Sequence, residues 1–145
     1  MKSTFVHPTH PDAQALLEEL SRTLSGLTGD DGTSSFATND FNPDTDAFLV
    51  ISAESRPLAC GGLRYLGAGV CEIKRMYAQV KGLGAEVLAG LESKAGVLGY
   101  RRVVLSTRRV NANAVRFYEK QGYREISPYG KYKRTDVSIC LGKDL

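Results

Sequence analysis

The sequence predicts an α/β fold: a mixed, mostly antiparallel sheet with a central parallel pair and helices on both faces. Three apolar runs follow one another through short turns between residues 46 and 77, which is typical of an antiparallel meander. A helical stretch at 84–98 then leads to an apolar run at 102–107, as in a crossover to a parallel strand. With 145 residues, 42% hydrophobic and 24% charged, we expect residues 1–145 to form one globular domain.

The first third of the chain is expected to contribute a strand, a helix and a loop. The strand is short, at 4–6. The helix spans 11–24, where one alanine and four leucines recur at spacings of three and four residues. Gly26 and Gly29 are expected to end it. Residues 30–45 are rich in Asp, Gly, Ser, Thr and Asn, which predicts a loop.

The rest of the chain alternates strands with two helices, which gives the overall order βαβββαβαββ. We expect strands at 47–51, 58–65, 70–77, 102–107, 123–126 and 136–141, and helices at 84–98 and 111–121. Gly99 and Gly122 are suited to end the helices, because glycine adopts the left-handed conformation of a helix C-terminus without steric cost.

Charge is distributed unevenly along the chain. Residues 1–60 contain three basic and nine acidic residues, a net charge of −6, whereas residues 61–145 contain sixteen basic and seven acidic residues, a net charge of +9. A basic half indicates an anionic partner, such as nucleic acid or a phosphorylated cofactor. The alternative is that the two halves neutralise each other in the fold.

Several classes of protein and site are excluded. No apolar run approaches the ~20 residues of a membrane span and no signal-peptide core opens the chain, so we expect a cytoplasmic protein without membrane partners. Cys60, Cys71 and Cys140 form no C-x-x-C pair and are expected to be small buried hydrophobes. His7 and His10 lack further ligands, so we expect no metal. No later histidine could activate a nucleophile.

A glycine-rich turn, QVKGLGA at 79–85, opens the helix at 84–98. Such a turn presents backbone N–H groups at the positive end of the helix dipole, and these groups bind phosphate. It is neither a Walker loop nor a dinucleotide fingerprint, because no G-K-[ST] follows and only two of the three glycines fit. Taken alone, the pattern favours a plain strand-to-helix turn.

The second motif is VNANAVRFYEKQGY at 110–123. Asn111 is a good N-cap for the helix that follows. Ala114, Val115 and Tyr118 share one face of that helix. Taken alone, Tyr118 is best interpreted as a core aromatic residue with its hydroxyl at the rim.

The two segments in this order resemble the GNAT superfamily of N-acetyltransferases. The family signature Q/R-x-x-G-x-G/A is matched by Gln79, Gly82 and Gly84. A downstream pattern, N-x-x-A-[IV]-x-[FL]-Y-E-[KR]-x-G-[FY], is matched by residues 111–123. The resemblance covers roughly residues 46–145 and implies the GNAT-like acyl-CoA N-acyltransferase fold.

The resemblance also implies an acetyl-CoA site between splayed parallel strands at 70–78 and 102–107. Backbone amides of the turn at 80–85 would hold the pyrophosphate, and main chain near Met76 and Ala78 would pair with the pantetheine and polarise the thioester carbonyl. The implied cofactor-binding residues are Met76, Tyr77, Ala78, Gln79, Lys81, Gly82, Leu83, Gly84, Ala85, Asn111 and Tyr118.

The implied reaction is direct attack of a neutral amine on the thioester, which needs a base or a water chain leading to one. Glu72 is the candidate base; the alternative is a structural charge paired with Lys74 or Arg75. Tyr118 matches the position from which family members protonate the departing CoA thiolate. Tyr129 is a candidate acceptor contact. The acceptor is expected to be a small-molecule or peptide amine, and a homodimer is compatible with the family.

One departure from the family pattern concerns the loop after Tyr77. Relatives have several residues between the strand that ends in M-Y-[VA] and the glycine turn, whereas here Ala78 leads directly into Gln79. Either the turn is tight, or a stretch is missing between Tyr77 and Lys81. We favour the missing stretch, because the motifs on both sides match well.

Two other functions stay open from the sequence. One is an acetyl-CoA sensor that has lost catalysis. The other is a nucleic-acid-binding domain, which lacks the interleaved aromatics of a recognised fold and which we do not expect; it would use Arg101, Arg102, Arg108, Arg109, Lys131, Lys133 and Arg134. A cationic acceptor could be attracted by acidic residues, or these could belong to a solvated loop: Asp30, Asp31, Asp40, Asp44 and Asp46.

Overall fold

The computed structural model describes residues 1–28 and 40–145. Its elements in chain order are β1 (Lys2–Phe5), α1 (Pro11–Thr28), β2 (Ala47–Ala53), β3 (Arg56–Gly67), β4 (Val70–Ala78), α2 (Leu83–Val97), β5 (Arg102–Arg108), α3 (Ala112–Lys120), β6 (Arg124–Glu125), the 3₁₀ helix η3 (Gly130–Arg134) and β7 (Ser138–Asp144). The order of strands and α-helices confirms the one predicted. Among the described helices, none combines the length and apolarity needed to cross a membrane.

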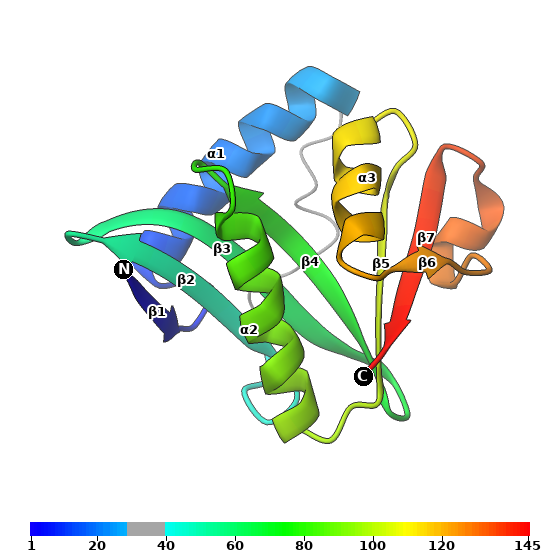
Figure 1. Cartoon of the computed structure of the whole chain (residues 1–145), viewed down its shortest axis with the longest axis horizontal. Coiled ribbons are helices and arrows are strands. Elements are labelled where there is room, and N and C mark those ends of the chain that lie inside the picture. Colours follow the sequence, from blue (N-terminus) through cyan, green and yellow to red (C-terminus); the bar gives the residue numbers. More distant parts are fainter. Residues whose placement is uncertain (29–39) are drawn as a thin grey trace.

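The seven strands form one sheet in the order β1-β2-β3-β4-β5-β7-β6 (Figure 1). The predicted meander is confirmed, because β2, β3 and β4 pair antiparallel in succession. The predicted crossover is also confirmed: α2 connects β4 to β5, and these two strands are parallel. Their ladder is short and runs only from the pair Val70–Arg102 to the pair Glu72–Val104.

Helices cover both faces of the sheet. Side chains alternate along a strand, so β2 directs Leu49 and Ile51 to one face and Phe48 and Val50 to the other. The first pair joins the large apolar cluster under α2 and α3. The second pair joins a smaller cluster with α1. The sheet therefore separates α1 from the two later helices.

Two elements differ from the prediction. α1 continues through Gly26 to Thr28, since one glycine in an exposed helix costs only about 1 kcal/mol. The segment that leads into β7 forms η3, a helix too short for its periodicity to be recognised in the sequence. Gly29 and residues 30–39 of the predicted loop lie outside the described residues.

The three cysteines are free and buried, as predicted. Burial raises the pKa of the thiols of Cys60 and Cys71 to about 12, so both stay protonated at neutral pH. Within residues 1–28 and 40–145, no three His, Cys, Asp or Glu side chains gather in a group that could hold a metal ion.

The chain runs continuously from β4 into α2 through a tight turn at 79–82. The backbone N–H of Gln79 donates to the carbonyl of Leu58 at 2.8 Å, which extends the pairing with β3. Gly82 has φ 95°, a conformation that glycine adopts without strain, and α2 begins at the next residue. The expectation of a missing stretch before Lys81 is therefore wrong: this turn closes in four residues.

Candidate active site

β4 and β5 separate beyond their short parallel ladder. A β-bulge interrupts the pairing of β4 with β3, and bulges bend the strand that contains them. Arg75 lies in this bulge with φ 59°. Its guanidinium donates to the carbonyl of Leu17 at 3.2 Å and to Ser21 Oγ at 2.7 Å, both in α1. The bulge and these bonds hold the second half of β4 beside α1.

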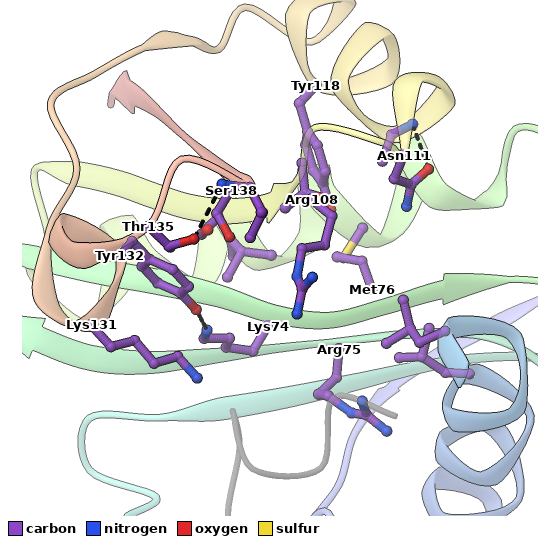
Figure 2. A pocket seen from close by; sticks show the side chains of 17 residues that line it. Lys74, Arg75, Met76, Arg108, Asn111, Tyr118, Lys131, Tyr132, Thr135 and Ser138 are labelled. Atoms are coloured by element: carbon purple, nitrogen blue, oxygen red, sulfur yellow. Dashed lines mark hydrogen bonds between the residues drawn. The ribbon is translucent and has the colours of Figure 1, made fainter. Parts of the chain in front are cut away.

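The space between the separated strands is a cleft of about 480 Å³ (Figure 2). Its lining comes from β4, β5, α1, α3 and the segment of η3 and β7: Leu20, Leu24, Ile73, Lys74, Arg75, Met76, Ser106, Thr107, Arg108, Asn111, Ala114, Tyr118, Lys131, Tyr132, Thr135, Val137 and Ser138. Residues from both faces of the sheet contribute, so the cleft passes through the sheet where its strands are unpaired.

One wall of the cleft is α3. Asn111 caps this helix, as predicted, and its Oδ1 accepts the N–H of Ala114 at 3.3 Å. Tyr118 is 8% exposed and packs edge-on against the rings of Phe117 and Tyr123. In Figure 2 its ring points from α3 into the cleft. Burial raises the pKa of the Tyr118 phenol, so the hydroxyl stays protonated and can donate a proton.

The N-terminus of α2 lies beside α3. A Cβ built on Gly84 would be 3.5 Å from Cζ of Phe117. The N-cap residue is Gly82, which makes no side-chain capping bond and has open space around it. The first-turn N–H groups of a helix have no intrahelical partner, and here the helix dipole adds positive potential. This end of α2 can therefore bind a phosphate group.

Basic residues line the cleft on the α1 face of the sheet. Lys74, Arg75, Arg108 and Lys131 line the cleft, and within the described parts of the chain no lining residue is acidic. Lys74 Nζ donates to the hydroxyl of Tyr132 at 2.5 Å and lies 5.1 Å from the centroid of that ring. In Figure 2 the charged end of Lys74 is directed at the Tyr132 hydroxyl, and the end of Lys131 lies beside this pair.

Glu72 lies next to Lys74 but outside the cleft lining. Its side chain is 2% exposed. Oε1 is 3.2 Å from Nε of Arg64, and Oε2 is 3.3 Å from Nζ of Lys74 and accepts the hydroxyl of Tyr129 at 2.6 Å. Both carboxylate oxygens are thus engaged. This geometry favours the structural alternative for Glu72 over the role of a base that meets an incoming amine.

A model of the Acetyltransferase (GNAT) family matches residues 13–123, which is most of the chain. The chain belongs to the GNAT acetyltransferase family. Acetyl-CoA-dependent acyl transfer is the general activity of this family, and the N-cap at Asn111 and the glycine turn lie within the matched region.

Relatives of this GNAT protein cover nearly its whole length. A protein of Azospirillum brasilense described as an IAA acetyltransferase is 27% identical over 135 residues, 90% of this chain and 88% of that one. The structure of a Klebsiella pneumoniae protein assigned as an acyl-CoA N-acyltransferase has a TM-score of 0.84 at 25% identity, covering 99% of this chain and 97% of that chain. The PaiA N-acetyltransferase of Thermoplasma acidophilum, solved with coenzyme A, has a TM-score of 0.75 at 17% identity and covers 100% of both chains.

The GNAT signature glutamine does not face the cleft in this protein. Gln79 Nε2 donates to Oε2 of Glu19 in α1 at 2.6 Å, and the hydroxyl of Tyr77 donates to the same oxygen at 3.0 Å. Burial and the hydrogen bond to Glu19 raise the pKa of the Tyr77 phenol. The side chains of Tyr77 and Gln79 therefore tie the short turn to α1.

The other expected site residues divide by position. Met76, Asn111 and Tyr118 line the cleft. Lys81 and Gly82 are exposed and precede α2, and Gly84 and Ala85 are in the first turn of that helix. Leu83 is 4% exposed and belongs to the core, and Ala78 packs against the core. Tyr129 contacts Glu72 and stacks edge-on against Tyr132, and it is not part of the lining.

Three of the acidic residues considered for a cationic acceptor, Asp40, Asp44 and Asp46, are described by the structure and do not line the cleft. Asp30 and Asp31 lie outside the described residues. Asp40 and Asp46 border a separate hollow of about 290 Å³. Asp46 is 9% exposed and accepts the backbone N–H of Tyr65 at 2.9 Å, so its charge anchors the loop to β3.

Sequence reasoning missed Ser106 and Tyr132. Ser106 Oγ is buried and finds no hydrogen-bond partner among the described residues, so the cleft offers it to a ligand. A polar residue inside an apolar strand was a usable signal for Ser106. Tyr132 gave no signal, because it lies in η3 and meets β4 only in the folded chain.

Proposed function

We propose that this protein, as one domain spanning residues 1–145, transfers the acetyl group of acetyl-CoA to a primary amine of a small molecule or peptide by direct attack. The observation that carries the proposal is the cleft itself. Tyr118, a buried phenol that stays protonated and can donate a proton, lines the cleft on one face of the sheet. Polar side chains, among them Lys74 and Arg108, line it on the other face. Membership of the GNAT family and the coenzyme A complex of the PaiA neighbour support it.

The residues present fit acetyl-CoA as a co-substrate. The uncapped N–H groups of Gly84 and Ala85 at the start of α2 would hold the pyrophosphate. Pantetheine would extend along β4 past Met76 into the cleft, where Ser106 Oγ offers an unused hydrogen bond. Acetyl-CoA supplies the activated acyl group when it is bound.

The proposed reaction forms an N–C bond and breaks the C–S bond of the thioester. The attacking amine must be neutral, because a protonated alkylammonium has no lone pair with which to attack the thioester. The amine gives up its proton to solvent in the cleft. The Tyr118 hydroxyl gives its proton to the departing thiolate sulfur, and proton transfer of this kind contributes about 10²–10⁴-fold to a rate.

The experiment that tests this function supplies acetyl-CoA with a panel of primary amines and measures both released CoA thiol and the mass of the N-acetylated product. Product formed only in the presence of protein and amine would support the proposal. Tight coenzyme A binding with no acetylated product from any amine class would instead support the catalytically inactive sensor.

We propose that Glu72 positions Lys74 and Tyr129 and does not act as the base. Glu72→Gln removes the charge between two cations, so the free energy of unfolding should fall by about 3 kcal/mol, as when one partner of a buried ion pair is lost. The kcat should stay within about tenfold of wild type with an unchanged pH profile, whereas loss of a general base costs about 10²–10⁴-fold. Denaturant unfolding and kcat measured against pH check the two parts.

The matched control is Glu125→Gln, which breaks an exposed pair with Arg109 at 3.6 Å and should leave stability nearly unchanged. A folded Glu72→Gln variant that loses the alkaline-rising limb of its rate profile would show that Glu72 is the base after all.

A further inference from the structure

The hydroxyl of Ser106 is a buried polar group without a partner. Its Oγ is shielded from solvent and meets no hydrogen-bond partner among residues 1–28 and 40–145. The residue nevertheless lines the cleft. An unpaired buried hydroxyl destabilises a folded protein, so the large majority of such groups in native structures have a partner. This combination indicates a hydroxyl whose partner is a molecule bound in the cleft.

The strand that contains Ser106 fixes the face of the sheet on which its side chain lies. β5 pairs residue for residue with β7 from Arg102 to Arg108, so its side chains alternate regularly between the two faces. Val103 and Leu105 belong to the core cluster under α2 and α3. Ser106 therefore points to the opposite face, which is the face of α1.

Ser106 lies at the point where β4 and β5 separate. The last pair of their parallel ladder is Glu72–Val104, and paired residues of neighbouring strands direct their side chains to the same face. Lys74 and Ser106 would form the next pair on that face, but the ladder has ended and both residues line the cleft. The Ser106 side chain is thus at the edge of the opening between the strands.

The two faces of this opening have different expected occupants. The pyrophosphate is expected at the N-terminus of α2, and Tyr118, the proposed proton donor to the thiolate, packs in the core cluster under α2 and α3. A cofactor bound from that face brings its thioester to the opening. The amine then reaches the thioester carbon from the other face, where Ser106 lies.

A serine hydroxyl suits the nitrogen of an amine. Its oxygen has two lone pairs that accept hydrogen bonds, and its O–H donates one. A neutral primary amine has N–H donors as well as its lone pair, so a bond from N–H to Oγ leaves the lone pair available for the carbonyl carbon. Holding the attacking atom in this orientation raises the rate, because the reactants lose their freedom on binding and not in the transition state.

We propose that Ser106 Oγ accepts a hydrogen bond from the attacking amine and holds its nitrogen against the thioester carbon, on the side opposite Tyr118. The proposal rests on the proposed acetyltransferase function and adds a substrate-binding residue to it. Ser106 lies between the two sequence motifs at 79–85 and 110–123 and belongs to neither.

The first test measures thermal stability without ligand. Ser106→Ala removes an unpaired buried hydroxyl, so the Tm should stay the same or rise by up to about 4 °C. Ser52→Ala makes the same change in β2, away from the cleft lining, and should leave the Tm nearly unchanged. A Tm clearly lower in Ser106→Ala would show that the hydroxyl already has a partner within the fold, and this would overturn the proposal.

Kinetics distinguish an acceptor contact from a cofactor contact. With the best primary amine of the panel as the substrate, Ser106→Ala should lower kcat/KM for the amine by about tenfold and leave the Kd of coenzyme A within about twofold. Ser106→Thr retains the hydroxyl and should recover most of the lost rate. If Ser106→Ala instead weakens coenzyme A binding and leaves the kinetics of the amine unchanged, the hydroxyl serves the cofactor and the proposal is wrong.

A binding experiment decides the proposal even if no amine is acetylated. Two analogues join butylamine or butanol to the sulfur of coenzyme A through an acetyl linker, so one carries an amide N–H where the other carries an ester oxygen. Calorimetry should show wild type binding the amide about tenfold more tightly than the ester, and Ser106→Ala binding the two alike. Ser52→Ala should keep the wild-type preference.

The outcomes separate Ser106 from the enzymatic function. An amide preference that is absent from wild type, or that persists in Ser106→Ala, would overturn the proposed contact and leave the acetyltransferase function standing. A preference that disappears in Ser106→Ala would uphold the contact, even if the amine panel gives no acetylated product.

Discussion

Replacing Tyr118 by Phe should slow acetyl transfer by about 100-fold or more while the protein stays folded. The phenyl ring keeps the edge-on contacts with Phe117 and Tyr123, so the packing under α3 is retained. The lost hydroxyl is the one buried proton donor that α3 directs into the cleft, as Figure 2 shows. Steady-state release of CoA thiol gives kcat, which should fall, and the KM for acetyl-CoA, which should change little.

The control makes the same change at a neighbouring ring. Tyr123→Phe also removes a buried hydroxyl, but that hydroxyl donates to Glu92 at 2.7 Å and lies outside the cleft lining. Tyr123→Phe should lower the free energy of unfolding and leave kcat nearly intact.

Burial raises the pKa of Tyr118, so no alkaline loss of activity from its ionisation should appear below pH 10 in wild type. A Tyr118→Phe variant with the wild-type rate would make Tyr118 a packing residue only.

The elements predicted well from the sequence are those with local causes. Asn111 caps α3 through its own side chain, and Gly99 and Gly122 have φ values of 93° and 94° where the helices end. These features depend on a few neighbouring residues. The parallel pair followed from the length of the crossover through α2, which also needs no long-range information.

The contacts between β4 and η3 beside the cleft could not be predicted in this way. Lys74 and Tyr132 are 58 residues apart, and Glu72 and Tyr129 are 57 apart, so their bonds exist only once η3 docks on β4. The same docking decides the interpretation of Glu72. The sequence left its two roles open, and burial among three partners now favours the structural one.

The tight turn before α2 shows how a family pattern can mislead. A loop shorter than in relatives suggested lost residues, yet the chain closes the turn with Gly82 at φ 95° and ties it to α1 through Gln79 and Glu19. The short turn thereby places α1 next to the start of α2, where we expect the pyrophosphate of the cofactor to bind.

Gly84→Glu should weaken coenzyme A binding by about 100-fold. The structure accepts a side chain here, because a Cβ on Gly84 would meet Phe117 at an ordinary van der Waals distance of 3.5 Å. The new carboxylate would stand in the first turn of α2, where the pyrophosphate is expected. Two like charges about 5 Å apart at a protein surface repel by about 3 kcal/mol, which corresponds to about 100-fold in affinity. Calorimetric titration with coenzyme A measures the change.

Two variants separate local repulsion from general effects. Gly84→Ala adds bulk without charge and should bind coenzyme A within a few-fold of wild type. Gly96→Glu adds the same charge near the other end of α2, where a new Cβ meets nothing within 4 Å, and should also bind normally. If all three variants bind alike, the pyrophosphate is not held at the start of α2. If Gly84→Glu alone is weak and added salt partly restores its binding, the repulsion is electrostatic and the helix N-terminus is the phosphate site.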